Sequence, residues 1–359
     1  PTTQLINGLF RRHRERGVIS VTVYSNTKND NSPTYNRIKD EAERYVDILN
    51  VAAPQVATRI NEDGMNVLVD LKQHTEDNLL LVFGLRPAPV QVAWLGFPGP
   101  SGGGFADLVF SDRVVTPPET ASFYDSKLGL IPGSYQMNDY RAMESAGIIK
   151  PSPPRHGVSD GVVIGCLNNP RKIRASVFAS WMRVMQQVNT TRLALLVRYP
   201  QFTPNNLNAE ATAFGVDPAR IEFLPVRSTT EHLSRFGDLD LFLDTFPYNA
   251  HTTGSEALFQ QLPLLTRPGQ GFASRVAASL LSAVSSTSLI ARDAADYEAV
   301  ATKLAQHPQQ LTRLREHLRQ AKESAVYDQN VFVARLEQTL LQAWDGGGKY
   351  HVIPTNLIQ

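Results

Sequence analysis

In the segment LDTFPYNAHTTGSEAL, residues 243–258, an imidazole and two hydroxyls lie where a strand pattern changes to a helix pattern. The residues before it are apolar, as in a buried strand, and the residues after it are spaced as in a helix. A helix start leaves about four backbone N–H groups free and carries roughly half a positive charge. His251, Thr252 and Thr253 add side-chain donors there, so the segment could bind a phosphate or diphosphate. The alternative is that Thr252 or Thr253 only caps the helix.

A second candidate is Lys172, in the segment VVIGCLNNPRKIRASV, residues 162–177. This segment also has the pattern of a strand, a loop and a helix, with Asn168 and Asn169 beside the lysine. A lysine at such a turn can reach a phosphate as a point charge, although taken alone it is more simply a solvated surface side chain. Because the carboxyl ends of parallel strands share one edge of a sheet, we expect Lys172 and His251 on the same side.

Other motifs give weaker signals. GFPGPSGGG, residues 96–104, is rich in glycine but lacks the spacing of a dinucleotide fingerprint, so we interpret it as a tight loop. Asp238 and Asp240 resemble a pair of metal ligands, but their strand pattern favours a structural role. A Ser–His–Asp order, a Cys–His pair and an H-E-x-x-H motif are all missing from the sequence, which gives no support to a hydrolase.

Length and charge narrow the class of protein. The 359 residues carry a net charge of +1 and a single cysteine, Cys166. The charge balance argues against a nucleic acid or a membrane surface as the main partner, and one cysteine excludes a disulfide within the chain. No signal peptide is recognisable, and we expect a cytoplasmic protein, also nuclear if the source is eukaryotic.

The elements that must position these residues alternate between strand and helix patterns, which predicts an α/β fold. Residues 35–49 and 54–64 are expected as helices, and purely helical sequence runs from about 294 to 344. We predict two Rossmann-like domains that face each other across a cleft, with a Pro- and Ser-rich linker between them. Strands are expected at 18–25, 65–71, 90–96 and 106–112 in the first domain, and at 162–168, 192–199, 221–226, 238–245 and 263–268 in the second.

Three long motifs, in order, carry a resemblance to a known family. LRPAPVQVAWLGFPGPSG, LDTFPYNAHTTGSEAL and PGQGFASRVAASLL resemble the catalytic region of O-GlcNAc transferases. The resemblance implies the GT-B architecture, with C-terminal helices that cross back. It implies an inverting enzyme that needs no metal or other cofactor and moves N-acetylglucosamine (GlcNAc) from UDP-GlcNAc to Ser or Thr hydroxyls of proteins.

The resemblance also implies roles for particular residues. Lys172 and His251 are expected to be catalytic, with Lys172 stabilising the departing UDP. The residues expected to bind the donor are Thr75, Leu95, Gly96, Asn169, His232, Arg235, Thr252, Thr253 and Glu256. The expected domains are 1–149, a linker at 150–161, a nucleotide-sugar domain at 162–325, a crossing helix at 326–345 and a tail at 346–359.

The chain departs from the family pattern at several points. The family begins this domain with a strand and a His-Pro-Thr sequence, so we expect that strand and its histidine before Pro1, after helical repeats of the TPR type. Thr229 and Arg171 replace a lysine and an aromatic residue, and Glu256 stands where an aspartate is usual. Two alternatives therefore stay open: a Spindly-type fucosyltransferase that uses GDP-fucose, and a scaffold that binds a sugar nucleotide without catalysis.

Overall fold

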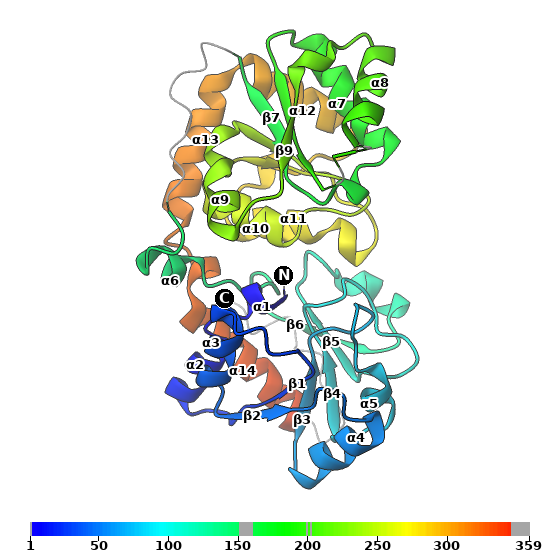
Figure 1. The fold of residues 1–359 in the computed structure, drawn as a ribbon, viewed down its shortest axis with the longest axis vertical. Coiled ribbons are helices and arrows are strands. Elements are labelled where there is room, and N and C mark those ends of the chain that lie inside the picture. Colours follow the sequence, from blue (N-terminus) through cyan, green and yellow to red (C-terminus); the bar gives the residue numbers. More distant parts are fainter. Residues whose placement is uncertain (1, 151–160, 199, 202, 346–359) are drawn as a thin grey trace. The chain divides into compact units, whose positions relative to one another are not determined.

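The computed structural model describes residues 2–150, 161–198, 200–201 and 203–345, and the chain divides into two compact units (Figure 1). Unit 1 comprises Pro1–Asp139 and Ala325–Gln359, and unit 2 is Tyr140–Ser324. The first unit thus ends ten residues before the expected boundary at 149, because Tyr140 packs with unit 2. Its hydroxyl lies 2.9 Å from Ser255 Oγ and its ring centroid 5.2 Å from that of Phe259. Most of the expected linker and the whole expected tail lie outside the described residues.

In the described residues, unit 1 contains two parallel sheets. β1 (Thr22–Ser25) pairs with β2 (Arg44–Asp47), and the second sheet has the order β3-β4-β5-β6. In the described residues β1 and β3 share no ladder, although Tyr24 of β1 and Leu68 of β3 pack against one apolar cluster that includes Val56 and Ile60. The remaining strands are Val67–Asp70, Val90–Ala93, Leu108–Ser111 and Lys127–Leu130, and the helices are α1 (Thr2–Leu5), α2 (Leu9–Arg16), α3 (Pro33–Glu41), α4 (Ala53–Glu62), α5 (Leu80–Gly84) and α14 (Gln329–Asp345).

The helix predicted over residues 35–49 is wrong in its second half. Helix α3 ends at Glu41, and Ala42 already has extended backbone angles, φ −63° and ψ 136°. Residues 44–47 then form β2, in a register that places Arg44 opposite Thr22. Tyr45 and Val46 favour a strand, and pairing with β1 satisfies backbone groups that a further helical turn would have paired internally.

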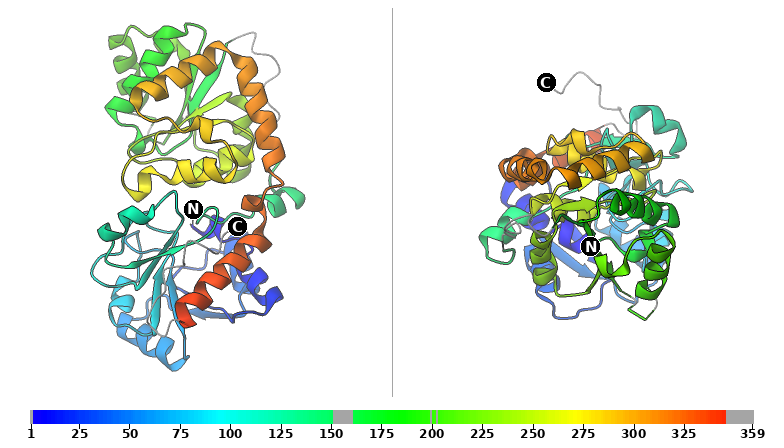
Figure 2. Two further views of the ribbon diagram at one scale, coloured as in Figure 1. Left: turned by 180° about the vertical axis from the view of Figure 1, so that it is seen from behind. Right: turned by 90° about the horizontal axis from the view of Figure 1, so that it is seen from above.

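Helix α14 belongs to unit 1 although it follows unit 2 in the chain. It packs on α2 and β6, and the left view of Figure 2 shows it in red. Glu337 fixes this contact, because its carboxylate accepts hydrogen bonds from His13 Nδ1 at 2.8 Å and Arg16 Nε at 2.7 Å. The C-terminal sequence therefore returns to the first unit, as the resemblance implied.

Unit 2 has one continuous parallel sheet with the order β11-β10-β7-β8-β9. From β7 the chain adds β8 and β9 on one side, and then places β10 on the other side of β7. The strand order therefore reverses between β7 and β10. The strands are Val163–Cys166, Arg192–Val197, Ile221–Pro225, Leu241–Leu243 and Leu264–Leu265, and the helices are α6 (Tyr140–Ser145), α7 (Ala175–Gln187), α8 (Thr203–Ala213), α9 (Thr229–Ser234), α10 (Thr252–Phe259), α11 (Val276–Ala283), α12 (Ala294–Gln306) and α13 (Pro308–Ala321).

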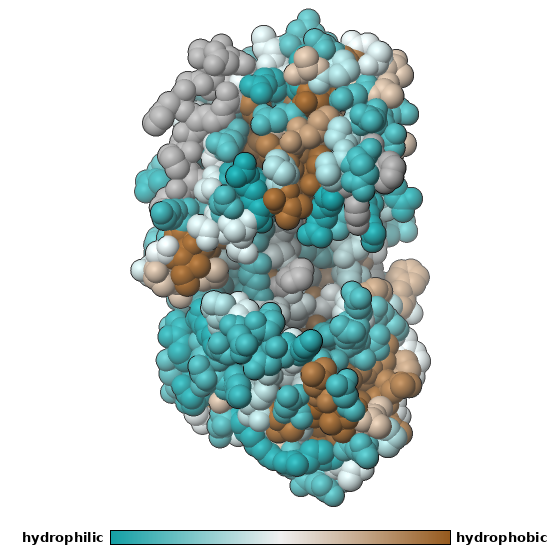
Figure 3. Space-filling model, viewed as in Figure 1, coloured by the Kyte–Doolittle hydropathy of each residue, from teal (hydrophilic) through white to brown (hydrophobic). Residues whose placement is uncertain are grey.

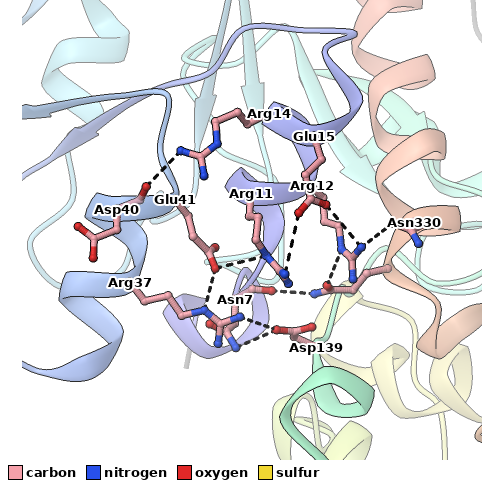
Figure 4. A network of polar contacts seen from close by, with 11 residues as sticks. Asn7, Arg11, Arg12, Arg14, Glu15, Arg37, Asp40, Glu41, Asp139 and Asn330 are labelled. Atoms are coloured by element: carbon pink, nitrogen blue, oxygen red, sulfur yellow. Dashed lines mark hydrogen bonds and ion pairs between the residues drawn. The ribbon is translucent and has the colours of Figure 1, made fainter. Parts of the chain in front are cut away.

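A polar network in unit 1 surrounds the two points where the chain leaves and re-enters that unit (Figure 4). Asp139 Oδ2 accepts hydrogen bonds from Asn7 Nδ2 and Arg37 Nη2, both at 3.1 Å. Gln329, at the start of α14, donates to the Asn7 carbonyl at 2.7 Å. Asn138 donates to the Val326 carbonyl at 3.2 Å. The segment before α2 is thus bonded to both crossing points.

Candidate active site

The point where the strand order reverses in unit 2 is where open α/β sheets commonly bind ligands, just beyond the carboxyl ends of the strands. β7 and β10 are adjacent and parallel there. The loop after β7 leads to the short 3₁₀ helix Pro170–Lys172, and the loop after β10 leads to α10. The topology therefore brings Lys172 and the start of α10 to the same edge of the sheet.

Lys172 lies directly against the loop that follows β10. Its Nζ donates a hydrogen bond to the Asn249 carbonyl at 2.7 Å and lies 4.1 Å from the centroid of the Tyr248 ring. Burial lowers the pKa of Lys172 to about 8, partly opposed by the Asp244 carboxylate. The amine therefore remains mostly protonated at pH 7, and its positive charge is poorly solvated and available to an anion.

Asn169 shapes the turn that carries this lysine. It precedes the 3₁₀ helix, and its Oδ1 accepts a hydrogen bond from the Arg171 backbone N–H at 3.1 Å. Asn168 is fully buried, and its side chain donates to Asp244 and Thr245 at 3.1 and 2.9 Å. Both asparagines therefore hold the backbone of the loop, and the half-buried Asn169 amide retains donors that a ligand could use.

His251 occupies the N-cap position of α10. Its Nε2 donates to the Ala273 carbonyl at 3.1 Å, and its ring stacks on Tyr248 with 4.9 Å between centroids. Burial and the nearby Lys172 lower the pKa of His251 to about 3, so the ring is neutral at pH 7. Because Nε2 carries the proton, Nδ1 is an acceptor, and the donor role expected for this imidazole is already used within the protein.

Thr252 and Thr253 are the first two residues of α10, and both are half-buried. The interpretation of either residue as an ordinary N-cap is wrong, because the cap residue is His251 and its side chain makes no capping hydrogen bond. The first N–H groups of a helix have no partner inside the helix. The start of α10 can therefore offer backbone donors together with two hydroxyls.

Three residues expected to bind the nucleotide, His232, Arg235 and Glu256, lie in or next to α9 and α10. His232 Nε2 on α9 lies 3.6 Å from Glu256 Oε2 on α10, which brings these two side chains together. Arg235 is only 6% exposed and donates to the Pro225 carbonyl at 2.8 Å, so part of its guanidinium is used to fasten the end of β9. Among these three residues, only the half-buried His232 keeps substantial exposure.

Thr75, Leu95 and Gly96 lie in unit 1, in the loops that follow β3 and β4. Thr75 Oγ1 donates to the Lys72 carbonyl at 2.8 Å. Leu95 has a φ of 73°, which is unusual for a residue with a side chain. A Cβ atom on Gly96 would lie 2.1 Å from the Leu71 carbonyl oxygen, so only glycine fits. Gly96 and Thr75 thus both lie against the backbone of residues 71–72, and Leu95 is the one of the three with an uncommon backbone angle.

The sequence interpretation missed Asp244, Tyr248 and Asn249. Tyr248 and Asn249 contact Lys172 directly, and Asp244 accepts hydrogen bonds from both loops of the site. Asp244 carried one usable signal, since it directly follows a strand of continuous apolar residues and precedes the His-Thr-Thr loop. In the described residues no cluster of three or more His, Cys, Asp or Glu side chains could hold a metal.

Comparison with known proteins places the chain in a family. The model of glycosyl transferase family 41 matches residues 1–150 and 145–336, and the chain belongs to this family. It is 30% identical over 351 residues to a protein of Arabidopsis thaliana named as the probable UDP-N-acetylglucosamine–peptide N-acetylglucosaminyltransferase SEC, covering 96% of this chain and 36% of that protein. It is also 30% identical to a tomato protein named as the corresponding transferase SPINDLY, with 92% of this chain and 36% of the relative covered.

Solved structures agree with this assignment. A mutant of the O-GlcNAc transferase of Thermobaculum terrenum superposes with a TM-score of 0.87 at 27% identity, covering 97% of this chain and 66% of that one. The galactosyltransferase WaaB shares the fold alone, with a TM-score of 0.58 at 10% identity. The chain has the GT-B architecture, and it spans about a third of the length of the curated relatives. None of the described helices is long and apolar enough to cross a membrane.

Proposed function

We propose that this protein transfers GlcNAc from UDP-GlcNAc to Ser or Thr hydroxyls of proteins, with inversion at the anomeric carbon. The observation that carries the proposal is the contact between Lys172 and the loop before α10, which puts a cation and free helix N–H groups at one edge of the unit 2 sheet. Membership of the family and the names of the relatives support the same donor and acceptor.

The chemistry proposed is a single displacement. The acceptor hydroxyl attacks the anomeric carbon while the bond to UDP breaks, and negative charge grows on the departing diphosphate. Lys172 supplies a fixed positive charge for it, and Thr252 and Thr253 supply backbone N–H groups and hydroxyls. Donors that are oriented in advance stabilise such charge more than water does, typically by several kcal/mol in the transition state. The residue that accepts the proton from the hydroxyl is unassigned.

The nucleotide would bind beside α9 and α10. The close pair of His232 and Glu256 supports a ribose and base site there, since a carboxylate accepts from ribose hydroxyls and an imidazole can contact a base. Thr75, Leu95 and Gly96 are proposed to contact the sugar. Metal independence and a cytoplasmic location remain predictions of the sequence, and the first is tested by transfer in excess EDTA, which should leave the rate unchanged.

The decisive experiment measures transfer of labelled sugar to protein. The wild type is incubated with UDP-GlcNAc or GDP-fucose, and β-elimination identifies sugar bound to Ser or Thr. Label from UDP-GlcNAc alone is expected, whereas label from GDP-fucose alone would establish the Spindly-type alternative. No label from either donor, together with stabilisation by UDP, would favour the scaffold. A ligand at a hundred times its Kd stabilises by about 2.7 kcal/mol, which a thermal melt detects.

Lys172→Met tests the leaving-group role within the same assay. Transfer should fall by about a thousandfold, the scale on which removal of a single stabilising donor acts. Lys303→Met is the matched control, because Lys303 is an exposed lysine on α12 in the same unit. Transfer by Lys172→Met within a few fold of the control would contradict the proposed mechanism.

A further inference from the structure

Asp244 is a buried carboxylate that the proposed chemistry does not use. It directly follows β10 and has no exposed surface. Its Oδ1 accepts hydrogen bonds from the backbone N–H groups of Thr245 at 2.8 Å and Ala250 at 2.6 Å, and from Asn168 Nδ2 at 3.1 Å. Its Oδ2 accepts from Thr266 Oγ1 at 2.6 Å. A buried carboxylate is retained at such a place only when donors and charge compensate its desolvation.

The four donors come from three strand ends, so one side chain joins the loops of the site. Asn168 lies in the loop that carries Lys172, Ala250 directly precedes His251, and Thr266 follows β11. The bond to Ala250 closes the loop between β10 and α10 over the carboxylate.

Two further bonds set the shape of this closed loop. Thr245 Oγ1 donates to the Tyr248 carbonyl at 2.7 Å, and Asn249 Nδ2 donates to the Thr245 carbonyl at 2.8 Å. This shape turns the Asn249 carbonyl towards the Lys172 amine, 2.7 Å away. The position of the amine thus depends on the loop that Asp244 holds.

Asp244 also supplies charge to the site. Burial raises its pKa to about 6, and the nearby Lys172 is among the groups that oppose this rise. In return the carboxylate raises the pKa of Lys172, which burial alone would lower further. Each group therefore favours the charged form of the other. Cys166, which also lies close, is neutral because burial raises the pKa of its thiol to about 12.

We propose that Asp244 is a positioning residue of the donor site: it fixes the Lys172 and His251 loops relative to each other and sets a buried carboxylate in the loop that Lys172 contacts, before the diphosphate arrives. Its effect on transfer rests on the proposed function, but its effect on Lys172 does not. The diphosphate would then enter a site whose cation and helix start are already in place, and would take over as the partner of Lys172.

The test compares Asp244→Asn with Asp240→Asn. Asparagine keeps the shape and the acceptor Oδ1 but removes the charge. Asp240 is the matched control, because it is a buried aspartate at the other end of β10 whose Oδ2 accepts from the Val163 N–H at 2.8 Å. The pKa of Lys172 is measured by NMR of the reductively methylated protein, with Lys172→Met to assign the signal. Rates of transfer are measured against pH.

In Asp244→Asn the pKa of Lys172 should fall by about one unit, and transfer should fall by about tenfold with its alkaline limb moved to lower pH. Asp240→Asn should leave both unchanged. An unaltered Lys172 pKa in Asp244→Asn, or equal losses of transfer in both variants, would overturn the proposal. If the wild type transfers nothing, the function has failed, while the lysine measurement still decides the role of Asp244.

A reciprocal measurement covers the case in which Asp244→Asn does not fold. Removing the cation in Lys172→Met should raise the pKa of Asp244, seen as a titration of its carboxyl carbon at higher pH than in the wild type. Titration at the wild-type pH would show that the two groups do not interact, and would overturn the charge role.

Discussion

Both units contain parallel strands, but the first strand of each unit is buried to a different extent. In unit 2 the first strand, β7, lies in the middle of a continuous sheet, and β7 and β10 are buried along their whole length. In unit 1, among the described residues, the first strand, β1, pairs only with β2, and every residue of β1 is half-buried. β3 begins a second sheet and is half-buried over Val67, Leu68 and Val69. Figure 3 shows apolar surface in the region where Figure 1 places β1 and β3.

The comparison shows that forming a strand and burying it are separate matters, because β1 forms a strand although its residues stay half-buried. Unit 2 has the strand order expected of a doubly wound sheet, in which strands are added on both sides of a central strand. Unit 1 has both halves, β1-β2 and β3-β4-β5-β6, but no described strand joins them. One further parallel strand between β1 and β3 would give unit 1 the same order as unit 2.

The largest expected effect is on hydrogen exchange. In this chain the amides of β1 and β3 should exchange at least about a hundredfold faster than those of β7 and β10, because protection follows burial and pairing. β4, which is buried in unit 1, provides the control for unit-wide differences. Equal protection of β1, β4 and β7 would show that the divided sheet is as stable as the continuous one.

Gly96→Ala should destabilise unit 1 by about 2–3 kcal/mol, because the new Cβ meets backbone that cannot move aside. Urea unfolding measures the loss. Gly271→Ala in unit 2 is the control, since nothing lies within 4 Å of the Cβ position there. A Gly96→Ala protein as stable as the control would mean that the loops after β3 and β4 can separate freely.

The same truncation in the two sheets should have unequal effects. Val163→Ala in buried β7 is expected to cost about 2 kcal/mol of unfolding free energy, and Val23→Ala in half-buried β1 less than about 1 kcal/mol. Denaturant unfolding followed separately in each unit gives both values. Equal costs for the two truncations would show that β1 is as well buried in solution as β7.

A further prediction concerns pH. His251 is neutral in the folded protein because its pKa is lowered to about 3, whereas in the unfolded chain it binds a proton below about pH 6.5. Its contribution to the stability of unit 2 is therefore lost as the pH falls from 6.5 towards 3, at no more than about 1.4 kcal/mol per pH unit. His251→Gln should flatten this slope in thermal melts of unit 2. If the dependence of stability on pH is unchanged in this variant, another group causes the acid sensitivity of unit 2.

The sequence predicted the strands, and the shared position of Lys172 and His251 at one edge of a sheet, better than it predicted the connections between strands. Continuous apolar runs such as residues 162–168 indicated β7, and the strand-to-helix patterns around residues 172 and 251 were enough to select Lys172 and His251. The strand at 44–47 was hidden, since Tyr45 and Val46 also fit a helical spacing and only pairing with β1 decides between the two. The position of Asp244 after an apolar strand was a usable signal, but its role also depends on donors from two other segments, Asn168 and Thr266, which no local pattern reveals.

The network around Asp139 has a mechanical consequence. Asn7 donates to Asp139, where the chain leaves unit 1, and its carbonyl accepts from Gln329, where α14 begins. Asn138 and Val326 tie the outgoing and incoming segments of the crossing to each other. Both crossing segments are therefore held by the same amino-terminal residue, Asn7, and by each other. Cleaving the chain before α2 would loosen both segments together.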